Sequence, residues 1–186
     1  MFPDTKLSSA DDCMGSNVRD CSGFFRLNID QTLFFSISSL EEARTTDWSN
    51  YDGLITIENS RCSDPLRISS IPQTVLIFDD ISVPIPDYIE PQSHHIETAL
   101  EFASQTTGRL LIHCHAGISR STAICLSILA HRFGPGRERE ACKALMLISP
   151  LARPNALIIH LADEILGRDN VLFQTAWNSM QLSTPR

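Results

Sequence analysis

Short apolar runs and helical stripes alternate along most of this chain of 186 residues. Runs of about four or five mainly apolar residues, bounded by polar or glycine-containing segments, are typical of buried strands. Such runs predict strands near residues 33–37, 54–57, 74–78 and 109–113. Between the last two strands, apolar residues recur at helical spacing and predict a helix over 94–105, with a stripe formed by Ile96, Ala99, Leu100 and Ala103.

Helical patterns dominate the second half of the chain. They predict helices near residues 120–133, 137–148 and 155–167, with a break at Gly134-Pro135-Gly136 between the first two. Ser39 is expected to cap a further short helix, and Asn155 to cap the last one. Strands that alternate with helices indicate an α/β fold, here a mostly parallel central sheet of about four to five strands flanked by helices.

The first thirty residues lack this periodicity and are rich in serine and aspartate. We therefore predict a loosely ordered polar tail over residues 1–30. The whole chain, with 186 residues of which 42% are hydrophobic, is long enough to bury one sizeable core. A single domain over residues 31–186 is the corresponding expectation.

One loop carries the most specific chemical signal in the sequence. The strand near 109–113 runs directly into a Cys-x5-Arg-Ser segment, which we call the cysteine loop (residues 114–120), and a helix follows it. Backbone N–H groups and the dipole at a helix N-terminus favour an anion, and a cysteine placed there ionises more readily than usual. We therefore expect Cys114 to react as a thiolate. Gly117 allows a tight turn, and Arg120 offers a planar fork of donors that matches two phosphate oxygens.

This segment resembles the protein tyrosine phosphatase superfamily, whose signature His-Cys-x5-Arg-Ser/Thr corresponds to His113, Cys114, Arg120 and Ser121. The amino-acid sequence of the loop is similar to that of compact dual-specificity-type enzymes and small bacterial predicted tyrosine phosphatases. The segment over 149–155 is similar to the Pro-Asn segment that opens a late helix in those enzymes. The resemblance covers roughly residues 32–170.

The resemblance implies the cysteine-phosphatase fold and a phosphatase catalytic domain that hydrolyses phosphotyrosine in proteins, and it leaves phosphoserine and phosphothreonine open as further substrates. Cys114 would attack phosphorus and form a cysteinyl-phosphate intermediate. Charge stabilisation would come from Arg120 together with backbone N–H groups of the phosphate-binding residues His115, Ala116, Gly117, Ile118 and Ser119. In the family, Ser121 would help the thiolate leave in the second step, and His113 would hold the loop rather than act as the base.

The leaving group also needs a proton, which the family takes from an aspartate roughly thirty residues before the cysteine. Asp79, Asp80 and Asp87 all lie near that distance. Asp80 and Ile81 resemble the Asp-Ile pair that follows this strand in the bacterial relatives. We therefore predict Asp80 as the general acid, with Asp79 and Asp87 as the alternatives.

Composition restricts the partners. A formal net charge of −7 argues against nucleic acid as a partner and favours a phosphorylated protein or peptide. We expect no cofactor and no metal, because the chain has no Cys-x2-Cys pair to complement His113, Cys114 and His115. The sequence lacks a membrane-length apolar stretch and a basic N-terminal segment followed by an apolar core, so a cytoplasmic protein without a membrane partner is expected.

Cysteine spacing gives no sign of a disulfide framework, because six cysteines occur at irregular intervals. A protective disulfide between Cys114 and a nearby thiol such as Cys62 is a separate hypothesis.

Two other functions compete with a protein phosphatase. A phosphoinositide or small-molecule phosphatase is disfavoured because the family members with that activity usually carry lysines inside the loop, where this chain has His115, Ile118 and Ser119. A non-catalytic phosphotyrosine-binding module arises when the cysteine or the arginine is lost, and here both Cys114 and Arg120 are present.

Overall fold

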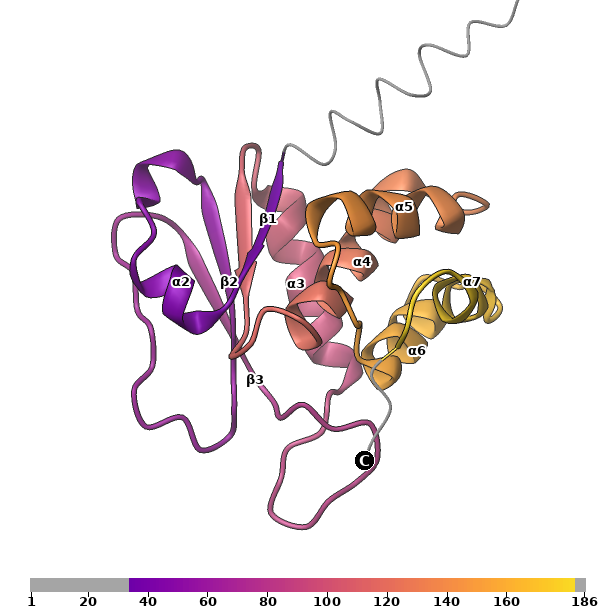
Figure 1. The fold of residues 1–186 in the computed structure, drawn as a ribbon, viewed down its shortest axis with the longest axis horizontal. Helices are drawn as coiled ribbons and strands as arrows, with labels where there is room; N and C mark the ends of the chain where they lie inside the picture. The colour runs from indigo at the N-terminus through magenta and orange to yellow at the C-terminus, as the bar shows by residue number, and fades with distance from the viewer. Residues whose placement is uncertain (1–33, 183–186) are drawn as a thin grey trace, which may run out of the picture.

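The computed structural model describes residues 34–182, so the predicted tail over 1–30 lies outside the described part of the chain. Within these residues the centre is a sheet of four parallel strands in the order β1-β4-β2-β3 (Figure 1). The strands are β1 (Phe35–Ser38), β2 (Gly53–Glu58), β3 (Gln73–Ile77) and β4 (Leu110–His113). The predicted fold class, a mostly parallel sheet flanked by helices, is confirmed.

The two central strands, β2 and β4, bury both of their faces. Ile55 and Ile112 belong to the larger hydrophobic core, whereas their neighbours Leu54 and Leu111 belong to a smaller core on the opposite face. Successive side chains of a strand point to opposite faces, so β2 and β4 each contribute to both cores. Burial on both sides explains why these two strands appear in the sequence as nearly continuous apolar runs.

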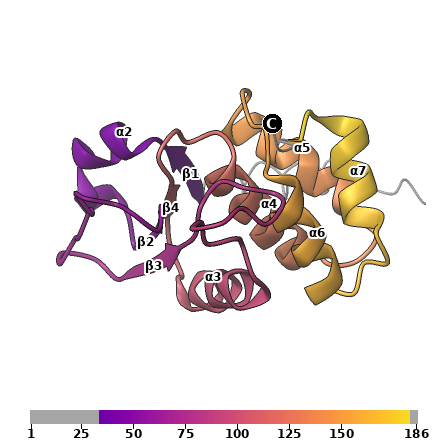
Figure 2. The same ribbon diagram turned by 90° about the horizontal axis from the view of Figure 1, so that it is seen from below.

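Helices α3 (Ser93–Gln105) and α4 (Arg120–Phe133) cover the face with the larger core (Figure 2). The side chains over 120–130 are all buried, because α4 lies between the sheet and the other helices. This burial agrees with a sequence that is apolar on nearly every side of the helix.

The outer helices pack on α4 rather than on the middle of the sheet. Both α5 (Glu138–Ile148) and α6 (Ala156–Ile165) contact α4, and α7 (Val171–Ser179) contacts α5 and α6. The first two match the predicted helices, whereas α7 was not predicted. Its buried side chains are Leu172 and Ala176, a stripe too short to stand out in the sequence.

The opposite face of the sheet is covered by α2 (Leu40–Arg44), the 3-10 helix η1 (Trp48–Asn50) and the loop that leads to β3. Ser39 caps α2 as predicted: its hydroxyl accepts from the Glu42 backbone N–H, while the Glu42 carboxylate accepts from the Ser39 N–H. The cap fixes where the chain turns after β1.

Among the helices over 34–182, none has the length and apolar character needed to cross a bilayer. The expectation of a single domain over 31–186 stays a prediction.

His95 on α3 is buried, at 7% exposure. Its ring lies 4.8 Å from the ring of Phe78, and its Nδ1 accepts a hydrogen bond from the Gln92 backbone N–H at 3.1 Å. Burial, together with the neighbouring charge of His94, lowers the pKa of His95 from 6.5 to about 4. The imidazole is therefore neutral in the folded chain at neutral pH.

We expect the free energy of unfolding to fall as the pH decreases from 6.5 towards 4. In that interval the unfolded chain binds a proton at His95 that the folded chain excludes, so the loss is at most about 1.4 kcal/mol per pH unit for this group. Urea unfolding at several pH values measures the slope. His95→Gln, whose amide oxygen can still accept from Gln92, should flatten it. Equal slopes for the wild type and His95→Gln would contradict this origin.

Candidate active site

The cysteine loop lies at the carboxyl edge of the parallel sheet, between the end of β4 and the start of α4. This edge is where ligands bind in open α/β sheets. Because α4 begins at Arg120, the loop is also at a helix N-terminus, where backbone N–H groups have no partner inside the helix. Sheet and helix together place these N–H groups around one small region.

One side of the loop is held by the turn between β1 and α2. The backbone N–H of Leu40 donates to the carbonyl of His115 at 3.1 Å. Gly117 approaches this turn so closely that a Cβ atom would lie 2.7 Å from the carbonyl carbon of Ser38 and 2.8 Å from the nitrogen of Ser39. Its φ of +72° also lies in the left-handed region. Glycine is therefore required at position 117 by both space and backbone conformation.

The other side of the loop is held by the segment before α6. The backbone N–H of Arg153 donates to the carbonyl of Ile118 at 2.9 Å, and that of Asn155 donates to the carbonyl of Ser119 at 3.3 Å. In a trans peptide the N–H that follows a carbonyl points the opposite way. Bonds that hold the loop carbonyls outward therefore turn the following N–H groups inward.

The sulfur of Cys114 sits inside this loop and is almost completely buried, at 2% exposure of the residue. It accepts a hydrogen bond from the Gly117 backbone N–H at 3.3 Å. The hydroxyl of Ser121 lies 3.3 Å from the same sulfur, where either atom can donate. Both contacts suit a thiolate, because an anionic sulfur accepts hydrogen bonds and donates none.

Arg120 is buried behind the loop at 3% exposure. Its Nη1 donates to the carbonyl of Phe78, just after β3, at 2.8 Å, while its Nε has no hydrogen-bond partner among the described residues. A buried N–H without a partner is costly, so such a group calls for an acceptor. An oxyanion bound in the loop would supply one.

Asp80, the predicted acid, contacts the loop directly. Its Oδ1 accepts from the hydroxyl of Ser119 at 2.7 Å and from Nδ2 of Asn155 at 2.9 Å. Its Oδ2 accepts no hydrogen bond within residues 34–182. The exposed carboxyl group is thus held beside the cysteine loop with one oxygen available.

Asp79 and Asp87 occupy different surroundings. Asp79 is buried, and its two oxygens accept from the backbone N–H groups of Ser60 and Ile89 at 3.1 and 2.9 Å. Burial alone would raise the pKa of Asp79, but these hydrogen bonds and the charge of Arg120 lower it overall. Asp87 is exposed, with a φ of +66°, and its side chain lies 3.9 Å from the Arg61 guanidinium. Asp79 thus ties two loops together, and Asp87 lies on the outer part of its loop.

His113 is buried at the end of β4, at 1% exposure. Its Nε2 lies 3.0 Å from the hydroxyl of Thr56, and its Nδ1 lies 3.4 Å from the carbonyl of Cys114. Burial lowers the pKa of His113, and the charges of Arg44 and Arg120 act in the same direction, against the Cys114 hydrogen bond and the charge of Glu58. The ring is therefore neutral at neutral pH and holds the loop through the backbone.

Some contacts were not foreseen from the sequence. Asn155 was expected as a helix cap and is one, accepting from the N–H groups of Leu157 and Ile158, but it also binds Asp80. No sequence pattern pointed to the role of Leu40 at the loop. The only available signal for such residues is their position at strand ends and helix starts near one edge of the sheet.

Of the six cysteines, those within the described residues are free thiols. Cys62 and Cys114 line the same small cavity of about 30 Å³. Burial raises the pKa of the Cys125 thiol and raises that of Cys142 to about 12, so neither is reactive at neutral pH.

No family model matches the chain. The bovine dual specificity protein phosphatase 18 is 32% identical over 89 residues, which are 46% of this chain and 45% of the relative. The chain therefore aligns with less than half the length of that relative.

Solved structures extend the likeness to the fold. The structure of DUSP15 superposes with a TM-score of 0.53 at 20% identity, over 81% of this chain and 95% of that one. The human tyrosine phosphatase-like serine/threonine/tyrosine-interacting protein gives 0.54 at 22% identity, over 69% and 84%. PTPMT1 in complex with PI(5)P gives 0.50 at 19% identity, over 72% and 91%.

The chain has the cysteine-phosphatase fold. The predicted resemblance to compact dual-specificity phosphatases of the protein tyrosine phosphatase superfamily is confirmed.

The close approach at Gly117 gives a direct test of the loop geometry. Gly117→Ala should lower stability by more than the roughly 1–2 kcal/mol of left-handed strain, because its Cβ also meets the Ser38 backbone. Displacement of the loop should also slow iodoacetamide alkylation of Cys114, because the Gly117 N–H that bonds the sulfur moves away. Gly167→Ala is the matched control, with a φ of +61° and nothing within 4 Å of the added Cβ. Urea unfolding and mass spectrometry of the alkylated peptide measure both effects, and indistinguishable variants would contradict the steric argument.

Proposed function

We propose that this chain is a cysteine-dependent phosphomonoester hydrolase that acts on phosphotyrosine proteins through a cysteinyl-phosphate intermediate. The observation that carries the proposal is the sulfur of Cys114, which accepts from the Gly117 N–H inside a loop whose carbonyls are bonded outward. The likeness to dual specificity phosphatases supports a phosphatase in general. The substrate and the roles of individual residues are part of the proposal.

In the first step the Cys114 thiolate attacks phosphorus in line, and the bond from phosphorus to the ester oxygen breaks. The inward N–H groups of the loop and the guanidinium of Arg120 stabilise the equatorial oxygens of the phosphoryl group. The unpartnered Nε of Arg120 supplies one of these donors. Local charge is needed because the chain as a whole carries a net charge of −7.

A proton must reach the departing phenolate oxygen. We assign this step to Asp80, whose Oδ2 is available beside the loop, whereas both oxygens of Asp79 are occupied by backbone donors. In the second step a water molecule attacks the phosphocysteine, and Asp80 accepts its proton. The hydroxyl of Ser121, 3.3 Å from the sulfur, stabilises the departing thiolate.

The same assays distinguish two alternative functions from a protein phosphatase. A phosphoinositide phosphatase would need cationic side chains in the loop, where His115, Ile118 and Ser119 stand instead. A phosphotyrosine-binding module would retain affinity without turnover, and one of the similar structures is a phosphatase-like interacting protein. Phosphotyrosine peptides, phosphoserine peptides and phosphoinositides should therefore be assayed side by side, with turnover of phosphotyrosine expected to be fastest.

Cys114→Ser should abolish turnover of an aryl phosphate while it retains binding of a phosphotyrosine peptide, because the loop N–H groups and Arg120 remain. Arg120→Lys should weaken both, because lysine cannot present two parallel donors to phosphate. Steady-state kinetics and calorimetric binding measure the two properties. Cys62→Ser is the control, because it removes the other thiol that lines the same small cavity as Cys114, and it should leave turnover unchanged. Wild-type protein that binds the peptide but never hydrolyses it would favour the binding module.

Asp80→Asn should lower kcat/KM on an aryl phosphate with a poor leaving group by about 10² to 10⁴ and remove the basic limb of the pH-rate profile. Asp79→Asn should instead lower stability, because Asp79 holds the backbones of Ser60 and Ile89. Asp87→Asn should alter neither property. Profiles of all three variants, with urea unfolding as the check on folding, measure these expectations. If Asp79→Asn alone lost the basic limb in a folded protein, the assignment to Asp80 would be wrong.

A further inference from the structure

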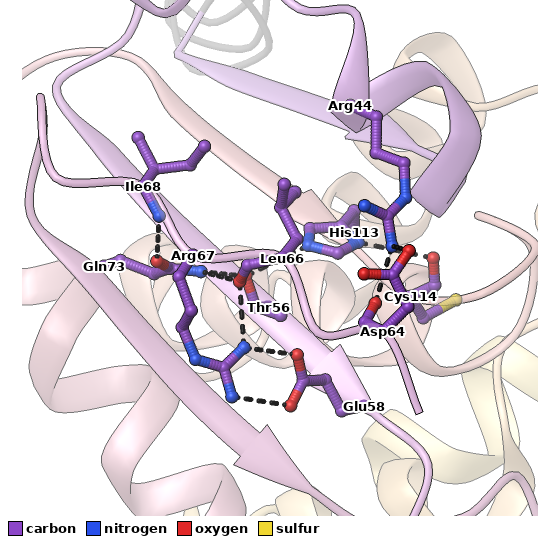
Figure 3. Close-up of polar contacts among 10 residues, drawn as sticks. All are labelled: Arg44, Thr56, Glu58, Asp64, Leu66, Arg67, Ile68, Gln73, His113 and Cys114. Atoms are coloured by element: carbon purple, nitrogen blue, oxygen red, sulfur yellow. Dashed lines mark hydrogen bonds and ion pairs between the residues drawn. The ribbon is translucent and has the colours of Figure 1, made fainter. Parts of the chain in front are cut away.

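We propose that Thr56 and Gln73 are positioning residues that fix His113 in one tautomer, with its proton on Nδ1, and thereby orient the first peptide group of the cysteine loop. The inference extends the proposed function, on which its catalytic consequence rests. The tautomer itself follows from hydrogen bonds of the described residues, shown in Figure 3.

The chain of hydrogen bonds begins at Gln73, where the orientation of the side-chain amide is unambiguous. Its Oε1 accepts from the backbone N–H of Ile68 at 2.8 Å, and its Nε2 donates to the carbonyl of Leu66 at 2.9 Å. A backbone N–H can only donate and a carbonyl can only accept, so the amide cannot be flipped. The second N–H of Nε2 therefore points at the hydroxyl of Thr56, 2.8 Å away.

The orientation of the Gln73 amide in turn fixes which atom donates in the hydrogen bond between Thr56 and His113. The two residues are directly paired in the register of β2 and β4, and both are almost completely buried. Because the Thr56 oxygen already accepts from Gln73, its own proton needs an acceptor, and Nε2 of His113 lies 3.0 Å away. If Nε2 carried a proton instead, the hydroxyl proton of Thr56 would be buried without a partner, at a cost of about 1–3 kcal/mol. Nε2 is therefore the acceptor, and Nδ1 carries the proton of the neutral ring.

The protonated Nδ1 faces the carbonyl of Cys114 at a long hydrogen-bond distance of 3.4 Å. This contact directs the Cys114 carbonyl away from the loop centre, so the N–H of His115, in the same peptide group, points the opposite way. It is the same arrangement that Leu40 and Arg153 impose on the other loop carbonyls. With the other tautomer, two acceptors would face each other and this first carbonyl would be released.

Charged groups around His113 belong to several elements. Glu58 at the end of β2 pairs with Arg67 on the following loop, and Arg44 of α2 pairs with Asp64 (Figure 3). Arg120 approaches from α4. Burial and the nearby cations disfavour a second proton on the ring. A proton on Nε2 would also face the hydroxyl proton of Thr56, so the hydrogen-bond direction favours the same neutral form.

The test uses Thr56→Val, which removes the hydroxyl at nearly constant shape, and Thr56→Ser, which keeps it. Long-range proton–nitrogen NMR spectra of the ¹⁵N-histidine-labelled full chain identify the protonated ring nitrogen, with His113→Gln to assign the signals. We expect the proton on Nδ1 in the wild type and in Thr56→Ser, and a mixture of tautomers in Thr56→Val. Iodoacetamide alkylation of Cys114 as a function of pH, read by peptide mass spectrometry, should move to higher pH in Thr56→Val but not in Thr56→Ser. Its kcat/KM on an aryl phosphate should fall about fivefold, the factor of roughly one net hydrogen bond.

Gln73→Leu should shift the NMR and alkylation readouts in the same direction by a smaller amount, because the Thr56 hydroxyl then loses the donor that sets its direction. A wild-type ring protonated on Nε2, or a Thr56→Val variant with the wild-type tautomer and alkylation profile, would overturn the proposal. An unchanged Gln73→Leu would overturn the part assigned to Gln73. The NMR and alkylation measurements do not require turnover, so a wild-type chain without phosphatase activity would refute the proposed function while the tautomer remained testable.

Discussion

The direction of the peptide groups in the cysteine loop is the constraint on which the candidate site depends. A loop can gather its N–H groups around one point only if the carbonyls of the same peptides are bonded elsewhere. Here the turn before α2 holds one carbonyl through Leu40, and the segment before α6 holds others through Arg153 and Asn155. His113 supplies the corresponding contact at the first carbonyl. Segments that are far apart in the chain therefore hold the cysteine loop in shape together, and the loop leads directly into the start of α4.

The electrostatics of the site follow from burial rather than from net charge. The chain carries a net charge of −7, yet a nearly buried guanidinium stands behind the loop with one N–H unsatisfied among the described residues. Of the acidic groups near the site, Glu58 is paired with Arg67, and both oxygens of Asp79 accept from backbone N–H groups. A small region of positive potential can thus persist in an acidic protein, because the dipoles and the arginine act at short range in a poorly hydrated place.

The consecutive residues Asp79 and Asp80 point in different directions, and their roles differ accordingly: one is structural, and the other is the proposed general acid. Asp79 points inward and bonds two backbone N–H groups, whereas Asp80 points towards Ser119 and Asn155. The buried anchor at Asp79 fixes the start of the loop after β3, and so helps to fix where the next carboxyl group lies. The proposed acid therefore depends on its neighbour for position.

The parallel α/β architecture, the strand β4, the buried helix α4 and the loop between them could be predicted from the order of the residues, because these features depend on local periodicity and on one compact motif. The sequence also identified the cap at Ser39 and the cap at Asn155, since capping is a contact within a few residues. It did not indicate the burial of His95, the helix α7, or the contacts of Leu40, Thr56 and Gln73 with the site. Those depend on which strands lie side by side and which loops meet at the sheet edge. Only the tertiary structure decides such contacts, because a hydrogen bond between distant segments leaves no periodic trace in the order of the residues.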